Sequence, residues 1–306
     1  PVSGGKDSTW QIVKCLEYGL TPLAVTWRTP GRTQLGQENL NNLINLGVDH
    51  IDFTINPKVE AYFIKKTFEK YGIPAIPQHL AIYQIPLSIA EKFSIPLIVW
   101  GENSALEYGG EDNEVNETKL TENWISKYGV TNGTRAADWI DKFLTKKKLS
   151  SYFAPKISKI EKKKITAIYL GSYFNWNARN TFKVAKKFGF KHKSGSPELG
   201  FYNFADIDCK FMAIHHYLKW YKFGFTRTFD NLSLDIRNNK ITRKKALKLL
   251  EKNLKSKHMH PTDSIDAFCK FIKISRKEFY KICEKFRNKK IWKKNKNDWI
   301  LKTPLR

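Results

Sequence analysis

The sequence predicts an α/β domain with a parallel sheet, followed by a mainly helical region. Two observations carry this prediction. Short apolar segments alternate with amphipathic helices over the first 190 residues, as in strands joined by helical crossovers. Charge also divides the chain: residues 1–145 have a net charge of −4, whereas residues 146–306 have +29. The alternation ends with a helix expected at 177–188, so we expect one domain at 1–189 and a basic region that meets a substrate or partner at 190–306.

The first domain is expected to contain five strands. Pro1-Val2 forms the end of the first strand, so we expect upstream sequence to complete it. The other strands are expected at 23–27, 50–54, 95–100 and 165–170, and the helices at 7–18, 37–46, 57–71, 78–93 and 177–188. Pro57 occupies the first helical position, which favours proline.

Two further regions differ from this alternation. Residues 104–164 combine an acidic and a lysine-rich stretch and are expected to be an insertion, helical near 134–145. In the basic region, helices are expected at 205–221, 242–254, 262–271 and 276–287. The lysine run 289–296 is predicted to be a solvated, flexible tail. His215 and His216, on the first of these helices, are expected to be packed rather than catalytic.

A glycine-rich hexapeptide, Ser3-Gly4-Gly5-Lys6-Asp7-Ser8, lies where the first strand turns into the first helix. Unpaired backbone N–H groups and the positive end of the helix dipole bind anions at such a turn. The glycines let the backbone approach an oxyanion closely and adopt positive φ. Ser3 and Ser8 add hydroxyl donors, Lys6 adds a cation, and Asp7 either caps the helix or holds Mg²⁺. The pattern predicts a phosphate-binding loop; the alternative is an ordinary capped turn.

Ligands of parallel sheets bind at the carboxyl ends of the strands, which directs attention to two more segments. Thr26-Trp27 ends the second strand, where the backbone is expected to hold adenine. Trp27 either stacks on the base or packs in the core. Gly101 follows the fourth strand and allows close approach, while Glu102 either binds magnesium or a substrate hydroxyl or lies in a solvated loop. Asn103 is a candidate substrate contact.

The hexapeptide resembles the pyrophosphate loop (SGGxDS) of the N-type ATP pyrophosphatases. These include GMP synthetase, NAD synthetase, argininosuccinate synthetase and the tRNA-thiolating enzymes. Its spacing fits neither a Walker A loop nor a dinucleotide-binding loop. The resemblance implies a parallel five-stranded sheet of the adenine nucleotide alpha-hydrolase-like type, with ATP and Mg²⁺ bound at the loop.

Further stretches are similar to one branch of this superfamily, the N-acetyl sugar amidotransferases. These enzymes act in lipopolysaccharide O-antigen and pseudaminic- or legionaminic-type sugar pathways. Besides the loop, the matching stretches are 100–103, 169–173 with Trp176, 222–227, 236–237, 241–243 and Ala246. Because these matches extend over the whole chain, they favour a full-length relationship. Family members carry a cysteine-bearing segment before the loop, which we expect upstream.

The resemblance implies an AMP-forming C–N ligase. ATP would be cleaved between its α- and β-phosphates, and AMP would be transferred to the oxygen of a sugar N-acetyl group. Ammonia would then displace AMP and leave an acetamidino group. The hexapeptide would hold pyrophosphate and magnesium, with Lys6 and Asp7 as catalytic candidates. Arg227 and Arg237 are candidates for binding an anionic N-acetyl sugar or nucleotide-linked sugar. The sequence contains no recognisable glutaminase nucleophile, so a separate glutaminase subunit or the solution would supply ammonia.

Two other functions remain open. A tRNA-modifying member of the superfamily, which thiolates or forms lysidine, would explain the basic half. However, Lys outnumbers Arg 44 to 10, which argues against a dedicated nucleic-acid face. The four cysteines form no C-x-x-C pair, which argues against a thiolase and a zinc ribbon. The other alternative is a non-catalytic nucleotide-binding module, but this hypothesis leaves the Asp and Ser of the loop unexplained. No apolar run reaches membrane-spanning length and no signal peptide opens the chain, so a cytoplasmic location is expected.

Overall fold

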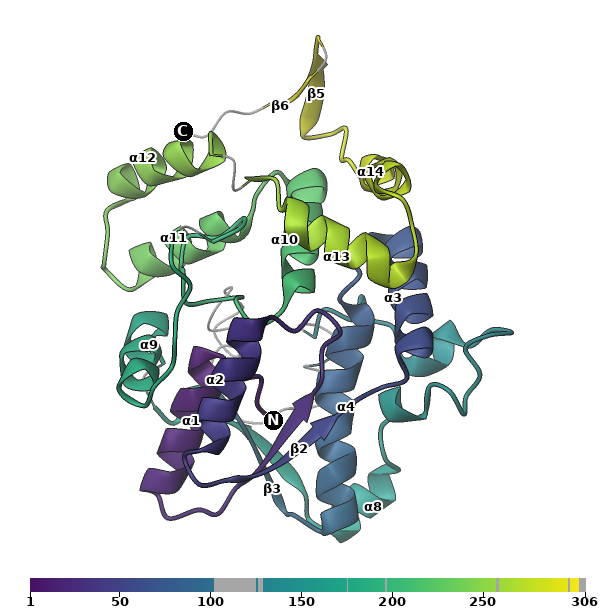
Figure 1. Cartoon of the computed structure of the whole chain (residues 1–306), viewed down its shortest axis with the longest axis vertical. Coiled ribbons are helices and arrows are strands. Elements are labelled where there is room, and N and C mark those ends of the chain that lie inside the picture. The colour runs from purple at the N-terminus through teal and green to yellow at the C-terminus, as the bar shows by residue number, and fades with distance from the viewer. Residues whose placement is uncertain are drawn as a thin grey trace.

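The computed structural model describes residues 1–101, 125, 129–174, 176–195, 197–256, 259–296 and 298–302. Helices and short strands alternate in its first half, and helices dominate the second (Figure 1). The strands are β1 (Leu23–Trp27), β2 (Asp49–Phe53), β3 (Leu97–Trp100), β4 (Thr166–Tyr169), β5 (Trp292–Asn295) and β6 (Asp298–Leu301). None of the described helices combines the length and apolar character that crossing a membrane requires.

The helices fall into two sets along the chain. In the first half they are α1 (Lys6–Glu17), α2 (Gln34–Ile44), α3 (Pro57–Tyr71), α4 (Ile76–Phe93), α8 (Ile157–Lys162) and α9 (Ala178–Lys187). The basic region contains α10 (Lys210–Phe223), α11 (Arg227–Arg237), α12 (Arg243–Leu254), α13 (Thr262–Ile272) and α14 (Arg276–Lys285). Among the described residues, short 3-10 helices are η1 (Ala136–Trp139), η2 (Ser150–Tyr152) and η3 (Leu170–Ser172).

The strands of the first half form two parallel pairs. β1 pairs with β2, and β3 pairs with β4. The first residues lie between the pairs: the Val2 N–H donates to the Val25 carbonyl over 2.8 Å. On the other side, Gln11 Nε2 donates to the carbonyls of Pro1 (3.2 Å) and Val99 (2.6 Å). The single five-stranded sheet stays a prediction, and this placement puts the expected first strand between β1 and β3.

Helices cover both faces of β1 because its side chains alternate in direction. Ala24 packs with α1 and α2 through Ile12, Leu40 and Leu43. Val25, on the opposite face, packs with α3 and α4 in a cluster that includes Val59, Phe63, Ile76 and Leu80. The predicted crossover helices therefore form a layer on each side of the strands (Figure 1).

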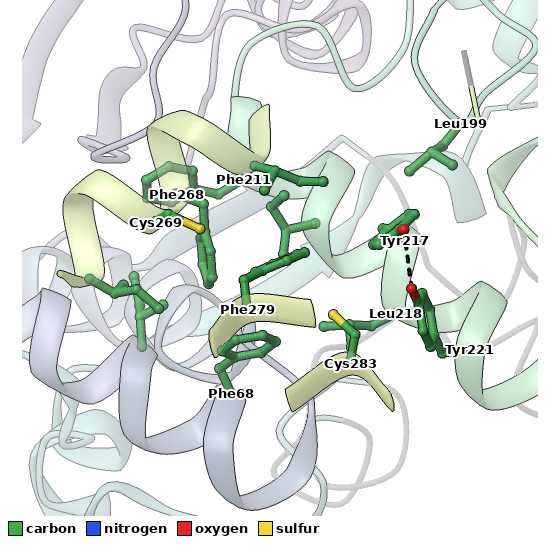
Figure 2. Close-up of a cluster of buried hydrophobic side chains, with 14 of the residues drawn as sticks. Phe68, Leu199, Phe211, Tyr217, Leu218, Tyr221, Phe268, Cys269, Phe279 and Cys283 are labelled. Atoms are coloured by element: carbon green, nitrogen blue, oxygen red, sulfur yellow. Dashed lines mark hydrogen bonds between the residues drawn. The ribbon is translucent and has the colours of Figure 1, made fainter. Parts of the chain in front are cut away.

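The basic region is joined to the first half by an aromatic core. Figure 2 shows Phe68, from α3, meeting side chains of α10, α13 and α14. The Phe68 ring stacks on Phe279 with centroids 5.5 Å apart and meets the edge of Phe268 at 5.4 Å. All three rings are fully buried. This shared core fixes α10 relative to the strands and so positions the candidate site between the two regions.

Three sequence predictions are wrong in detail. Residues 134–145 are not a continuous helix, because the Asp141 carboxylate accepts the N–H groups of Phe143 and Leu144 and closes a turn after η1. The helix predicted at 205 begins at Lys210, because the preceding residues form a loop in which Asp206 has φ +55°. The tail prediction fails at β5: the Trp292 side chain is buried and donates to the Tyr221 carbonyl over 2.9 Å.

Candidate functional site

A cavity of about 630 Å³ lies between the carboxyl ends of β1 and β3 on one side and α10 on the other. Its volume falls in the range of small-molecule sites. The hexapeptide supplies one wall through Ser3, Gly5 and the first turn of α1. The opposite wall comes from residues 204–209, α10 and Arg227. The cavity therefore brings together the predicted phosphate loop and the basic region.

Local hydrogen bonds shape the hexapeptide. The Ser3 N–H donates to Ser8 Oγ over 3.0 Å, and the Gly5 N–H donates to Ser3 Oγ over 3.2 Å. Gly4 has φ +88°, and a Cβ added there would lie 2.7 Å from the backbone nitrogen of Leu40 in α2. The loop can therefore pass this close to α2 only with glycine at position 4. Gly5 is the residue before the first turn of α1, so Asp7 does not cap the helix as one alternative supposed.

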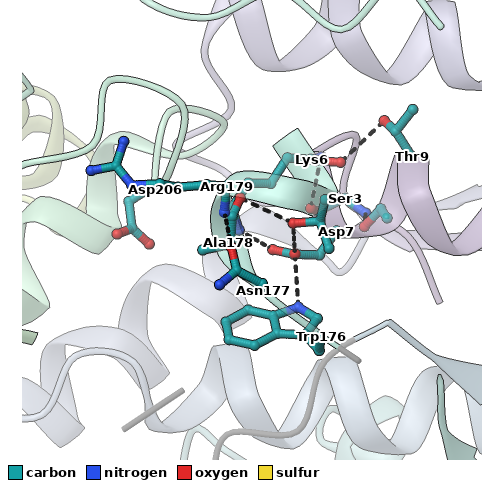
Figure 3. Close-up of polar contacts among 12 residues, drawn as sticks. Ser3, Lys6, Asp7, Thr9, Trp176, Asn177, Ala178, Arg179 and Asp206 are labelled. Atoms are coloured by element: carbon teal, nitrogen blue, oxygen red, sulfur yellow. Dashed lines mark hydrogen bonds and ion pairs between the residues drawn. The ribbon is translucent and has the colours of Figure 1, made fainter. Parts of the chain in front are cut away.

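Asp7 is instead anchored inside the protein (Figure 3). Its Oδ1 accepts from Trp176 Nε1 over 3.1 Å and from Thr181 Oγ1 over 3.0 Å, and its Oδ2 pairs with the Lys6 ammonium. Burial by itself raises the pKa of Asp7, but the Lys6 charge and these hydrogen bonds outweigh it and lower the pKa. Asp7 is thus ionised and holds Lys6, whose exposed fraction is 5 %, at the cavity.

The contacts of Asp7 affect the prediction that it binds Mg²⁺. Both Asp7 oxygens already face donors from the protein, so Mg²⁺ would bind there only by displacing one of them. Within the described residues, no cluster of three or more acidic, histidine or cysteine side chains could hold a metal ion. Mg²⁺ in nucleotide sites is bound by one or two carboxylates together with phosphates. Asp7 stays a predicted ligand.

The end of β1 places both predicted residues at the cavity. Thr26 is buried, with its Oγ1 2.9 Å from His50 Nε2. Trp27 packs against the core beneath and lines the cavity, and its stacking on a base stays a prediction. Its indole N–H donates to Glu60 Oε1 over 3.0 Å. Burial raises the pKa of Glu60 to about 8, against the opposing effect of that hydrogen bond.

Gly101 allows the close approach expected at the end of β3. A Cβ added to it would lie 2.8 Å from Gln11 Oε1 and 3.0 Å from the Asp7 carbonyl. Gly101 therefore packs against the first turn of α1 and lines the cavity. Glu102 and Asn103 lie outside the described residues.

The two predicted arginines lie at opposite ends of α11. Arg227 is buried and lines the cavity, and its Nε donates to Asp206 Oδ2 over 2.8 Å. Burial by itself raises the pKa of Asp206, but the Arg227 charge and His216 hold it well below the usual range. Arg237 lies ten residues further along the helix, about 15 Å away. It is not among the residues that line the cavity.

The α10 wall carries residues that sequence analysis did not assign to a site. His215, His216, Lys219 and Lys222 line the cavity. Burial lowers the pKa of Lys222 to about 8, and its Nζ donates to the Tyr71 carbonyl over 2.5 Å. The adjacent histidines were the one sequence feature that could have indicated a site here. Because they lie on a helix rich in aromatic residues, they were interpreted as packed side chains. Only the cavity that α10 shares with the hexapeptide reveals their position.

Residues 198–306 match a protein-family model described as "LPS biosynthesis protein WbpG-like, C-terminal domain". The match includes residues 204–209, α10 and α11. It therefore covers much of the cavity wall that faces the hexapeptide. Among curated proteins, none matches the chain. Residues 198–306 are therefore similar to the C-terminal domain of WbpG-like lipopolysaccharide biosynthesis proteins, which supports the predicted resemblance.

Proposed function

We propose that the chain is an ATP-dependent amidotransferase that converts the N-acetyl group of an anionic sugar into an acetamidino group. One observation carries the proposal: a single cavity has a phosphate-loop sequence on one wall and a WbpG-like domain on the other. A nucleotide and a sugar held in that cavity would meet without further rearrangement of the two regions.

The hexapeptide wall suits the triphosphate of ATP. The first N–H groups of α1 have no partner within the helix and face a cavity also lined by Ser3, Ser8 and the Lys6 side chain. Trp27 and Thr26 lie beside the loop at the end of β1, where adenine would bind. Mg²⁺, when bound with the phosphates, would neutralise charge that develops on the leaving pyrophosphate.

The α10 wall suits an anionic acceptor. Lys219, Lys222 and Arg227 place three cationic side chains there. Asp206 and Asp230 offset part of that charge, since they pair with Arg227 and Lys219 at 2.8 and 2.6 Å. The remaining positive charge would favour a carboxylate or phosphate on the sugar. Arg237 has no part in this proposal, because it lies away from the cavity.

The proposed reaction has two steps. The acetamido oxygen attacks the α-phosphorus of ATP and pyrophosphate leaves, which turns a poor electrophile into one with a good leaving group. Ammonia then attacks the activated carbon, and AMP departs with the C–O bonding electrons. Ammonia would come from a separate glutaminase or from solution. The main task of the loop is to stabilise negative charge on the pyrophosphate.

The test incubates the protein with ATP, Mg²⁺ and ammonium and a panel of nucleotide-linked and acidic N-acetyl sugars. We expect a product one mass unit lighter than the sugar, because NH replaces O, with AMP and pyrophosphate formed in equal amounts. Formation of AMP that depends on tRNA and not on any sugar would refute the proposal and favour a tRNA-modifying enzyme.

Two lysines of α1 provide a matched pair of variants. Lys6→Met removes the cation at the cavity but keeps most of the aliphatic side chain, and should lower product formation by about 100-fold. Lys14→Met removes a cation from the same helix that pairs with Glu17 and does not line the cavity. It should retain wild-type turnover. Equal effects of the two substitutions would contradict the assignment of the loop.

A further inference from the structure

His216 has an unusual environment for a buried polar side chain. Its exposed fraction is 3 %, and yet it lines the cavity. Neither of its ring nitrogens has a hydrogen-bond partner within the described part of the chain. Buried imidazoles are normally hydrogen-bonded, because an unsatisfied polar group loses its interaction with water. The nearest group to Nε2 is the Asp206 carboxylate, so it is Nδ1 that points to a ligand entering the cavity.

Charged groups surround this ring on several sides. The Asp206 carboxylate lies 3.7 Å from Nε2, and Arg227 binds the same carboxylate from α11. On α10, Lys219 adds a positive charge, and the His215 ring, whose pKa burial holds well below the ordinary value, lies with its centroid 5.6 Å away. Burial lowers the pKa of His216, the positive charges of Arg227 and Lys219 lower it further, and Asp206 opposes both. The imidazole is consequently neutral near pH 7 and able to accept a proton.

The loop at 204–209 connects this histidine to the phosphate loop. Asp206 faces His216, while the Asp208 carboxylate accepts a hydrogen bond from the Ser3 hydroxyl. The two aspartates are separated by one residue, so their Cα atoms are at most about 7 Å apart. Asp206 also has a left-handed backbone conformation, with φ +55°, which is uncommon outside glycine and clusters at functional sites. His216 therefore lies close to the side of the cavity where the α-phosphate of ATP would bind.

We propose that His216, oriented by Asp206, is the base that removes a proton from the nitrogen of the ammonia adduct. This assignment rests on the proposed amidotransferase function. Ammonia attacks the adenylated, N-protonated imidate and forms a tetrahedral adduct with an –NH₃⁺ group. Nδ1, the ring nitrogen that does not face Asp206, takes one proton from this group, and the adduct becomes neutral. The C–O bond then breaks, AMP leaves with its electron pair, and the amidinium cation remains. The imidazolium returns its proton to water.

The proposal separates two measurable steps. Exchange of labelled pyrophosphate into ATP, with the sugar present and ammonia absent, reports adenylation alone. Amidine formation with ammonium reports both steps. His216→Gln keeps a polar side chain of similar reach but cannot accept the proton. We expect it to lower amidine turnover by about 100-fold or more and to leave pyrophosphate exchange unchanged. His260→Gln, at an exposed position away from the cavity, should match wild type in both assays.

The pH profile provides a readout that a structural role would not move. At constant free ammonia, wild-type amidine turnover should fall at acid pH as His216 becomes protonated, and His216→Gln should lack this fall. Asp206→Asn removes the carboxylate that raises the pKa of His216, so the fall should shift to lower pH. Added imidazole should restore turnover to His216→Ala.

The outcomes are distinguishable. Loss of exchange and amidine formation to the same extent in a folded His216→Gln protein would overturn the assignment and indicate a binding or structural role. Unchanged amidine turnover would overturn it as well. If wild type catalyses no sugar-dependent exchange with any member of the panel, the proposed function itself fails, and the assignment fails with it.

Discussion

Gly4→Ala tests whether the hexapeptide is fixed by its packing on α2. Gly4 has φ +88°, and an added Cβ would lie 2.7 Å from the Leu40 nitrogen and 2.9 Å from its Cα. Leu40 is fully buried, and these are backbone atoms of a helix, so neither can move aside easily. The left-handed conformation costs a non-glycine residue roughly 1–2 kcal/mol. Overpacking typically adds about 1–3 kcal/mol. We therefore expect the free energy of unfolding to fall by about 2–5 kcal/mol.

Gly5→Ala is the matched control, since it adds the same methyl group to the neighbouring residue. Gly5 has φ −69°, which any residue adopts, and the nearest atom to an added Cβ is Ser3 Oγ at 3.3 Å. Its effect should stay below about 1 kcal/mol. Urea unfolding followed by circular dichroism measures both variants. If Gly4→Ala unfolds at the same urea concentration as Gly5→Ala, the loop is not held against α2 and the reasoning is refuted.

The remaining predictions concern two carboxyl groups, the partly buried Asp7 and the buried Glu60. Asp7→Asn replaces the oxygen that faces the Lys6 ammonium with an N–H donor, so we expect a loss of about 1.5–3 kcal/mol in urea unfolding at pH 7. Glu60 has a folded-state pKa of about 8, above its ordinary 4.5, so it stabilises the fold below pH 4.5 and loses that contribution as the pH rises towards 8. Glu60→Gln, which keeps an acceptor for Trp27, should remove up to about 1.4 kcal/mol per pH unit from the decline in stability between these values.

Each of these two predictions has a clear contrary result. Asp7→Asn unfolding at the wild-type urea concentration would show that the carboxylate contributes nothing to the anchoring of α1. Parallel stability–pH curves for wild type and Glu60→Gln, measured at pH 5, 6.5 and 8, would show that Glu60 ionises normally. In that case Trp27 would rest on a charged rather than a neutral carboxyl group.

Much of the fold was predictable because local signals agreed with tertiary packing. The strand at Leu23–Trp27 appears at its predicted bounds, and α3 ends at the predicted Tyr71 before Gly72, which has φ +59°. Errors arose where long-range contacts decide the structure. Trp292 lies in a lysine run that predicts a solvated tail. Its ring is nevertheless buried, because it packs against Trp220 and donates to the Tyr221 carbonyl, and these contacts hold β5 on the protein. Nothing in the local sequence indicates these contacts with α10.

Only the hexapeptide wall of the candidate site was predictable from the sequence. The hexapeptide has a recognisable spacing; Trp27 ends β1, Gly101 follows β3, and both residues line the cavity. Trp176 and Thr181 were not assigned roles, because they lie 169 and 174 positions from Asp7, to which they donate hydrogen bonds. The register of α10 likewise decides which of its residues face the cavity, and that register depends on packing against α3 and α13.

The loop at 204–209 gives the two walls of the cavity a direct mechanical connection. The Thr33 N–H at the start of α2 donates to the Asp208 carbonyl over 2.9 Å, and the Asp208 side chain accepts from Ser3. Two residues earlier, Asp206 holds Arg227 and faces His216. Any shift of the hexapeptide would thus move the loop at 204–209 relative to α10. Because α10 is fixed by the aromatic core behind it, the moving part would be the loop itself.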